Sequence, residues 1–186
     1  MDLQSFENSG FSRGAGPLRE GVWLIARRWL FLDSDMPWYA CRRSVLRCFG
    51  ARIGRKVVIK PQVKITFPWK LQVDDNAWLG EEAWILNLAP VTIDANVCLS
   101  QRVFLCTGNH DWSDPGFRLV TQPIAIREGA WVCANAFVGP GVTVGRDAVV
   151  TAGSVVTHDL PAGMVCSGNP CRPVRQRGKR EGGRTA

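Results

Sequence analysis

Aliphatic residues recur every six positions along most of this chain. The fifteen positions of the series are all Ile, Leu or Val, and the residue four places later is Val, Ala or Ser in twelve of the fifteen cases. An α-helix would spread a period of six around its axis, and a plain strand alternates with a period of two. The pattern therefore predicts short strands joined by corners, with the aliphatic residue pointing inward. The series is Ile53, Ile59, Ile65, Val73, Leu79, Ile85, Ile93, Leu99, Leu105, Ile126, Val132, Val138, Val144, Val150 and Val156.

The spacing also groups these units in threes. The steps from Ile65 to Val73 and from Ile85 to Ile93 are eight residues long, so two extra residues fall at the same corner of successive coils. Three strands per coil make a triangular solenoid. About five coils follow, and at roughly 4.8 Å per strand layer the solenoid is on the order of 25 Å tall.

Length and charge limit what else the chain can hold. A chain of 186 residues with 46% hydrophobic and 21% charged residues predicts one folded domain with short appendages. The net charge of +7 comes from the ends, because residues 61–171 hold 6 basic and 10 acidic side chains. Basic ends favour an anionic partner such as a membrane surface, a phosphate-rich ligand or nucleic acid, although simple solubility explains any single Arg.

The cysteines indicate the compartment. The seven cysteines are an odd set with no C-x-x-C pair, which predicts neither a disulfide framework nor a zinc ribbon. The first residues also lack the basic and then apolar run of a signal peptide. We therefore expect a cytoplasmic protein with reduced thiols.

The repeat is interrupted once, over residues 106–125. Leu105 and Ile126 are 21 residues apart, so a long loop carrying His110 stands off the solenoid. Long loops on rigid scaffolds are often functional, which favours His110 as a general base over a structural turn histidine. Asp111, Asp114 or a backbone carbonyl could orient its ring, and neither carboxylate is expected to be a nucleophile.

The pattern [LIV]-[GAED]-x-x-[STAV]-x over residues 50–176 resembles the hexapeptide-repeat acyltransferases. The resemblance implies an all-β fold, a left-handed parallel β-helix, and a homotrimer. We expect an N-terminal helical cap over residues 1–50, the β-helix over 51–171, and a basic tail over 172–186 that is disordered after 176.

Further motifs resemble the galactoside and maltose O-acetyltransferases. They are the G-N-H-D-W segment of the loop, Trp131-Val132, and the segments 140–145, 152–156 and 168–172. Two more segments, 47–54 and 67–70, are most similar to acetyltransferases assigned to colanic acid and other exopolysaccharide pathways. The resemblance implies acetyl-CoA-dependent O-acetylation of a saccharide or lipid-linked saccharide, with His110 as the base.

The resemblance also implies binding residues. Acetyl-CoA would contact Ala134, Ala152, Thr157, His158, Arg172 and Arg175. The family usually has Lys where His158 stands, and an Asn that helps bind the acceptor falls at Gly80. Polar substitutes for this Asn, and so candidate acceptor-binding residues, are Asn87, Glu81, Glu82 and Asp111.

The N-terminal arm, residues 18–49, interleaves Trp and other apolar residues with Arg. Its apolar stretches are shorter than the roughly 18 residues that a membrane-spanning helix needs. Two hypotheses stay open, and both can hold at once: a cap on the open first coil, or an interfacial helix on anionic lipid at the inner face of the membrane.

Other functions remain as alternatives. One is an acetyltransferase acting on an antibiotic or another small molecule, and another is a non-enzymatic scaffold with basic arms. A zinc enzyme like the γ-class carbonic anhydrases would need three His ligands, and the chain has two histidines. We therefore expect no metal. We also expect no nucleic-acid partner, because a scaffold with basic arms would leave the interruption over residues 106–125 unexplained.

Overall fold

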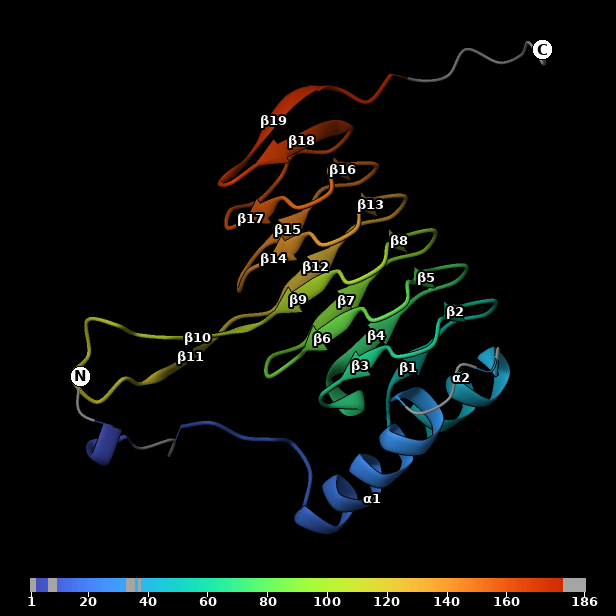
Figure 1. Cartoon of the computed structure of the whole chain (residues 1–186), viewed down its shortest axis with the longest axis vertical. Helices are drawn as coiled ribbons and strands as arrows, with labels where there is room; N and C mark the ends of the chain where they lie inside the picture. Colours follow the sequence, from blue (N-terminus) through green and yellow to red (C-terminus); the bar gives the residue numbers. More distant parts are fainter. Residues whose placement is uncertain (1–2, 7–9, 33–35, 37, 179–186) are drawn as a thin grey trace.

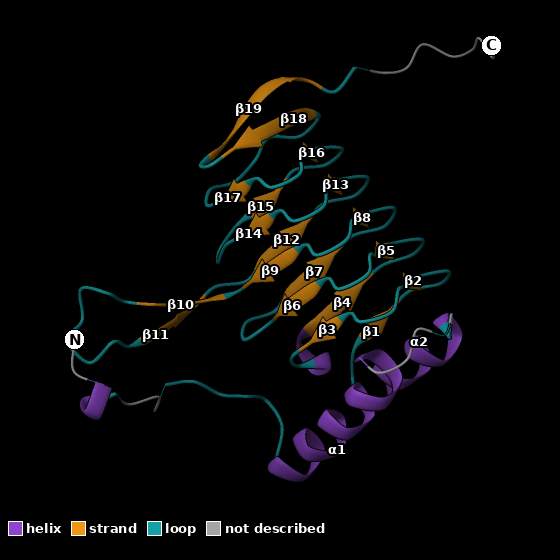
Figure 2. Ribbon diagram, in the orientation of Figure 1, coloured by secondary structure: helices purple, strands orange, loops and turns teal. Residues whose placement is uncertain are grey.

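The computed structural model describes residues 3–6, 10–32, 36 and 38–178. The chain winds into a parallel β-helix whose coils stack along one axis, with two helices at the N-terminal end and a hairpin projecting from one side (Figure 1). The expected all-β coil with an N-terminal helical layer is confirmed (Figure 2).

Three parallel sheets form the faces of the solenoid. Sheet A contains β1 (Arg52–Ile53), β4 (Leu71–Val73), β7 (Val91–Ile93), β12 (Ile124–Ile126) and β15 (Thr143–Val144). Sheet B contains β2 (Val58–Ile59), β5 (Trp78–Leu79), β8 (Cys98–Leu99), β13 (Trp131–Val132), β16 (Val149–Val150), β18 (Met164–Gly168) and β19 (Cys171–Gln176). Sheet C contains β3 (Lys64–Ile65), β6 (Trp84–Leu86), β9 (Phe104–Cys106), β14 (Phe137–Val138) and β17 (Val155–Val156).

The remaining elements lie outside these stacks. They are η1 (Leu3–Ser5), α1 (Pro17–Arg27), the π-helical turn η2 (Arg28–Leu32), α2 (Tyr39–Cys48), η3 (Pro68–Lys70), and the antiparallel pair β10 (Gly108–His110) and β11 (Leu119–Thr121).

The aliphatic series forms the core. Each of its fifteen residues lies on its own strand, and all are buried, with Ile53 the most exposed at 8%. The parallel register stacks them directly, for example Ile53 on Val73 and Val73 on Ile93. Successive coils therefore bury one continuous apolar column, which is the stabilising interaction in a solenoid.

The corners follow the same repeat. At the corners between sheets A and B and between sheets B and C, the residue three places after the aliphatic position has positive φ, as at Asn76, Asn96 and Asn135. Asn and Gly tolerate this conformation best, but Lys56 and Arg102 also adopt it. The corner between sheets C and A holds the insertions, including the segment that carries β10 and β11.

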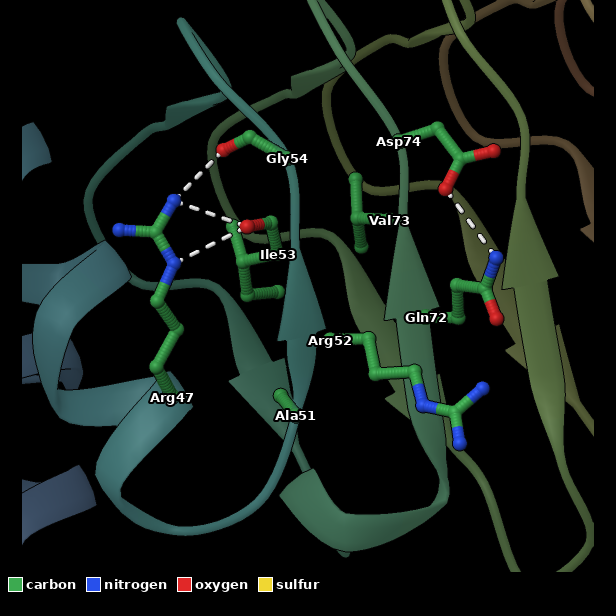
Figure 3. A pocket seen from close by; sticks show the side chains of 8 residues that line it. All are labelled: Arg47, Ala51, Arg52, Ile53, Gly54, Gln72, Val73 and Asp74. Atoms are coloured by element: carbon green, nitrogen blue, oxygen red, sulfur yellow. Dashed lines mark hydrogen bonds between the residues drawn. The ribbon is translucent and has the colours of Figure 1, made fainter.

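The N-terminal helices cap the first coil. In this β-helix the strands of each coil donate N–H groups to the carbonyls of the next, as in Gly54 N to Val73 O. Corner carbonyls such as Arg55 O accept from the second coil, but the strand carbonyls of the first coil have no partner strand. Arginine side chains supply the missing donors: Arg42 bonds to Ile59 O, Arg43 to Val57 O, and Arg47 to Ile53 O and Gly54 O. Figure 3 shows the Arg47 guanidinium directed at the last two carbonyls.

The C-terminal end of the solenoid is closed by a pair of antiparallel strands. β18 extends sheet B by a further layer and then pairs antiparallel with β19. β19 runs to Gln176, so it takes in the first five residues of the segment expected as a tail. From residue 179 onward the expected disordered tail lies outside the described residues.

Candidate active site

The interrupted repeat forms a hairpin. β10 and β11 pair antiparallel, with Gly108 opposite Thr121, Asn109 opposite Val120 and His110 opposite Leu119. The hairpin leaves the solenoid between β9 and β12, at the corner between sheets C and A (Figure 1). Residues 106–125 are therefore partly a two-stranded ribbon and not wholly irregular, which gives His110 a fixed backbone.

The ring of His110 is held by Phe117. The imidazole Nδ1 lies 2.7 Å from the backbone oxygen of Phe117, and the two rings stack 4.2 Å apart with an interplanar angle of 3°. A carbonyl oxygen only accepts hydrogen bonds, so Nδ1 carries the proton and Nε2 of the neutral ring has a free lone pair. Of the three orienting groups that the sequence left open, the structure selects the backbone carbonyl.

Asp111 and Asp114 hold the turn of the hairpin instead. Asp111 Oδ1 accepts hydrogen bonds from the side chain and the backbone N–H of Ser113, and Arg118 lies 3.3 Å from its other oxygen. These hydrogen bonds, those from Ser113 first, lower the pKa of the Asp111 carboxyl. Asp114 accepts a bond from Gly116 N. Asp111 still borders the cavity beside His110, so contact with a substrate stays a prediction.

A cavity of about 520 Å³ lies on the side of the hairpin that faces the later coils. We call it the upper cavity. Thr157, one of the expected acetyl-CoA contacts, borders it, and His158 is next to Thr157 with its Nδ1 2.9 Å from the Thr157 hydroxyl. The side chains that define it are Asn109, His110, Trp112, Gln122, Phe137 and Thr157.

The other predicted cofactor residues lie elsewhere on the chain. Ala134 and Ala152 are at the corner between sheets B and C, whereas Thr157 and His158 follow sheet C at the next corner. Arg172 and Arg175 are exposed on β19. A single chain therefore brings His110 close to Thr157 but divides the predicted cofactor residues between two corners.

The structure gives Asn87 a different role from the predicted one. Its side chain is fully buried, its oxygen accepts from Phe67 N at 2.9 Å, and its amide donates to Phe67 O at 2.6 Å. Both polar atoms thus bridge neighbouring coils. Glu81 and Glu82 lie at the corner between sheets B and C, where Glu82 pairs with Arg102, so neither lies at the corner that carries His110.

A second cavity, of about 430 Å³, was not predicted from the sequence. We call it the lower cavity. It lies between the N-terminal arm, the first coils and the hairpin, and Leu119, the strand partner of His110, borders it. Its walls include Phe11, Glu20, Trp23, Arg27, Phe67 and Trp69.

Two buried polar atoms in this wall lack partners. Glu20 Oε1 and Arg27 Nε have no hydrogen-bond partner among the described residues, and burial lowers the pKa of the Arg27 guanidinium. Unpaired buried polar atoms are costly unless a ligand or water satisfies them. No specific sequence signal pointed to this pair, because Glu20 and Arg27 are two of several charged residues in the arm.

The segment that precedes α1 is fastened beside His110. Lys70 Nζ donates to Ser12 O and Leu88 O, each at 2.6 Å, and Trp69 Nε1 donates to Arg13 O. The ring of Phe6 lies 5.7 Å from that of His110. Burial lowers the pKa of the Lys70 ammonium group. The segment before α1 therefore forms part of the site, whereas the helices that follow it form the cap.

Comparison with known proteins adds to this geometry. No family model matches the chain. The chain is 41% identical to WcaF of Escherichia coli (strain K12), which is named as a colanic acid biosynthesis acetyltransferase, over 95% of this chain and 97% of that protein. It is 30% identical to the galactoside O-acetyltransferase of the same organism, over 73% of this chain and 68% of the relative.

A solved structure shares the whole fold. The galactoside acetyltransferase in complex with coenzyme A superposes with a TM-score of 0.80 and 25% identity, covering 97% of this chain and 94% of that one.

Proposed function

Because the chain belongs to the family of the galactoside and colanic acid acetyltransferases, with their left-handed parallel β-helix, we propose that it transfers an acetyl group from acetyl-CoA to a saccharide hydroxyl. The observation that carries this proposal is the hydrogen bond between His110 Nδ1 and Phe117 O. It leaves Nε2 as the only ring atom able to accept a proton.

The reaction follows from that tautomer. Nε2 of His110 removes the proton of the saccharide hydroxyl while the oxygen attacks the carbonyl carbon of the thioester. A backbone N–H stabilises the negative oxygen of the tetrahedral intermediate. The carbon–sulfur bond then breaks, the acetyl ester remains on the saccharide, and the imidazolium returns its proton to the departing CoA thiolate. No bond to the protein forms.

The two cavities divide the substrates. We assign the upper cavity to the acetyl and pantetheine end of acetyl-CoA, because it is bordered by His110 and Thr157 and His158 is the neighbour of Thr157. We assign the lower cavity to the saccharide. Its Trp and Phe rings can pack on the apolar faces of a sugar ring, while Glu20 and Arg27 can bond to hydroxyls.

A homotrimer would complete the cofactor site. In one chain Ala134 and Ala152 follow strands of sheet B, whereas Thr157 follows sheet C at the next corner. If the corner between sheets B and C of one copy meets the hairpin corner of the next, both sets face one ligand. Exposed Trp78 and Trp131 on sheet B supply apolar surface for such a contact.

The acceptor class rests on the relatives. WcaF is named for colanic acid biosynthesis, and we propose a saccharide of an exopolysaccharide, carried on a lipid, as the acceptor here. Among the described residues, no helix has the length and apolarity needed to cross a membrane. We propose that the enzyme works on the cytoplasmic side, at the inner face of the membrane, where its thiols stay reduced.

The test is release of CoA thiol from acetyl-CoA with a panel of mono- and oligosaccharides, and with chloramphenicol as a small-molecule acceptor. We expect saccharides to stimulate release and the His110→Ala variant to lose about a hundredfold or more in kcat. His158→Ala is the matched control, since a cofactor contact should raise KM for acetyl-CoA and leave kcat largely unchanged. Saccharide-stimulated release that survives in His110→Ala would contradict the assignment.

A further inference from the structure

The outer side of the N-terminal helical layer carries an apolar stripe. Leu18, Val22 and Ile25 lie four and three residues apart on α1, and Trp29 follows four residues later in the adjoining π-helical turn. Their exposed fractions are 80%, 49%, 63% and 69%. Residues spaced by three and four lie on one face of a helix, so these side chains form one surface, which we call the outer stripe.

The outer stripe is separate from the surface that caps the solenoid. Trp23 of α1 and Phe31 of η2 are buried against the first coil, and Trp23 Nε1 donates to Ile65 O. The helix thus has one apolar face that packs on the solenoid and another that is largely exposed among the described residues. Capping explains the first face and leaves the second without a structural role.

The position of the stripe favours a flat partner. α1 lies at the end of the solenoid opposite β18 and β19, and the hairpin projects from the side (Figure 1). Neither Val22 nor Ile25 borders the upper or the lower cavity. A surface that covered the stripe would therefore approach the N-terminal end of the coil and leave the two cavities open.

The charge of this end of the molecule favours an anionic partner. Between Met36 and Val73 the chain has nine Lys and Arg residues and no Asp or Glu. Arg42, Arg43 and Arg47 donate to backbone carbonyls, and the side chains of Arg52 and Lys56 at this end are exposed. Exposed Trp and aliphatic residues beside basic groups are the composition of helices that lie at the surface of anionic bilayers.

We propose that Leu18, Val22, Ile25 and Trp29 dock the enzyme on an anionic lipid bilayer, with α1 parallel to the surface. The benefit to catalysis rests on the proposed function: a saccharide attached to a lipid lies at the bilayer surface, so docking confines the enzyme to the plane in which that acceptor diffuses. The binding itself requires no catalysis and can be measured separately.

The experiment is flotation of the full chain with vesicles of phosphatidylglycerol and phosphatidylethanolamine, and with vesicles of phosphatidylcholine alone. We expect binding to the anionic vesicles and a loss of about tenfold or more in partition for Val22→Glu/Ile25→Glu, because two inserted apolar groups become charged. Ala40→Glu/Ser44→Glu is the matched control. It adds the same charge to exposed positions of α2, outside the stripe.

Each outcome decides the inference. Binding lost in the stripe variant and largely kept in the control supports docking through the stripe. An equal loss of vesicle binding in both variants would mean that only net charge determines binding, and it would overturn the proposal. The proposal is also overturned if the wild-type chain does not float with anionic vesicles. It is overturned as well if the stripe variant sediments as a smaller assembly than the wild type, because the stripe would then join copies of the chain.

Activity distinguishes this inference from the proposed function. Both variants should transfer acetyl to a water-soluble saccharide at the wild-type rate, because their residues lie outside the cavities. Transfer without vesicle binding would reject the docking surface alone. Vesicle binding without any saccharide-stimulated transfer would reject the proposed function and leave the surface standing.

Discussion

The chemistry of the site depends on a few single contacts. Phe117 has a positive φ of 52°, a conformation uncommon for a bulky residue, and this turn presents its carbonyl to His110 Nδ1. Asp111 and Asp114 hold the turn through Ser113, Gly116 and Arg118. The acidic residues next to the histidine therefore act through the backbone and not by direct contact with its ring.

The backbone of the next coil leaves no room for a side chain at Gly80. A Cβ at this position would lie 2.5 Å from the carbonyl carbon of Ser100 and 2.7 Å from its oxygen, both in the backbone of the next coil. An Asn side chain, which the resemblance to the galactoside-type enzymes leads us to expect at this position, would therefore require this coil to move. We expect Gly80→Ala, the smallest step toward Asn, to lower the free energy of unfolding by about 1–3 kcal/mol.

The control for this substitution is Gly21→Ala. Gly21 lies in α1, and a methyl group added there would have no other atom within 4 Å, so the change should be neutral or raise stability by up to about 1 kcal/mol. Thermal unfolding of the two variants checks both values. Equal melting temperatures would mean that the backbone at residue 80 relaxes without cost.

At the scale of elements, the helical layer is an edge cap made of side chains. A parallel coil ends in unpaired carbonyls, and leaving buried ones unpaired costs stability. Here α1 contributes Trp23 and α2 contributes Arg42, Arg43 and Arg47 to those carbonyls. Arginine suits the task because its guanidinium has five donors in a rigid plane.

Arg42 gives the test of this cap. It is fully buried, and it donates Nε to Leu30 O and Nη1 to Ile59 O. Arg42→Met keeps most of the aliphatic part of the side chain but removes the hydrogen-bond donors. We therefore expect the free energy of unfolding, measured in urea, to fall by roughly 2–4 kcal/mol. Arg52→Met, an exposed position on β1, should change stability by less than about 0.5 kcal/mol. A similar effect of both substitutions would show that the edge carbonyls find water instead.

At the scale of the whole molecule, the solenoid separates groups that the proposed reaction would bring together. Its rigid coils place His110 and Thr157 at one corner and Ala134 and Ala152 at another. The outer faces beside the second corner carry aromatic columns, in which Trp84 stacks on Phe104 at 4.5 Å. A rigid scaffold cannot fold one corner onto the other, so a neighbouring copy is the means by which both could meet one cofactor.

Assembly can be tested on sheet B. Trp78 and Trp131 are exposed on its outer face, in register through Cys98. We expect Trp78→Glu/Trp131→Glu to reduce the mass in sedimentation from trimer to monomer and to abolish saccharide-stimulated thiol release. Thr92→Glu, on the outer face of sheet A, should leave both unchanged. A wild-type chain that sediments as a monomer and is active would reject the shared site.

The sequence by itself determined the coil. Each position of the six-residue series from Ile53 to Val156 is aliphatic because each coil buries its neighbour. The series therefore predicts one strand for each of its fifteen residues, and all fifteen strands are found where predicted. The break in that period also located the segment of His110. These features are readable because they depend on residue type at a fixed spacing.

Only the tertiary structure decided which groups act together. The partner of His110 is a backbone oxygen, which no side-chain pattern encodes. Both polar atoms of the Asn87 side chain form hydrogen bonds with the backbone of Phe67 in the preceding coil. The lower cavity joins Glu20 and Arg27 of the arm to Leu119 of the hairpin, nearly a hundred residues away. Such contacts arise where the arm crosses several coils, and the six-residue repeat carries no information about that crossing.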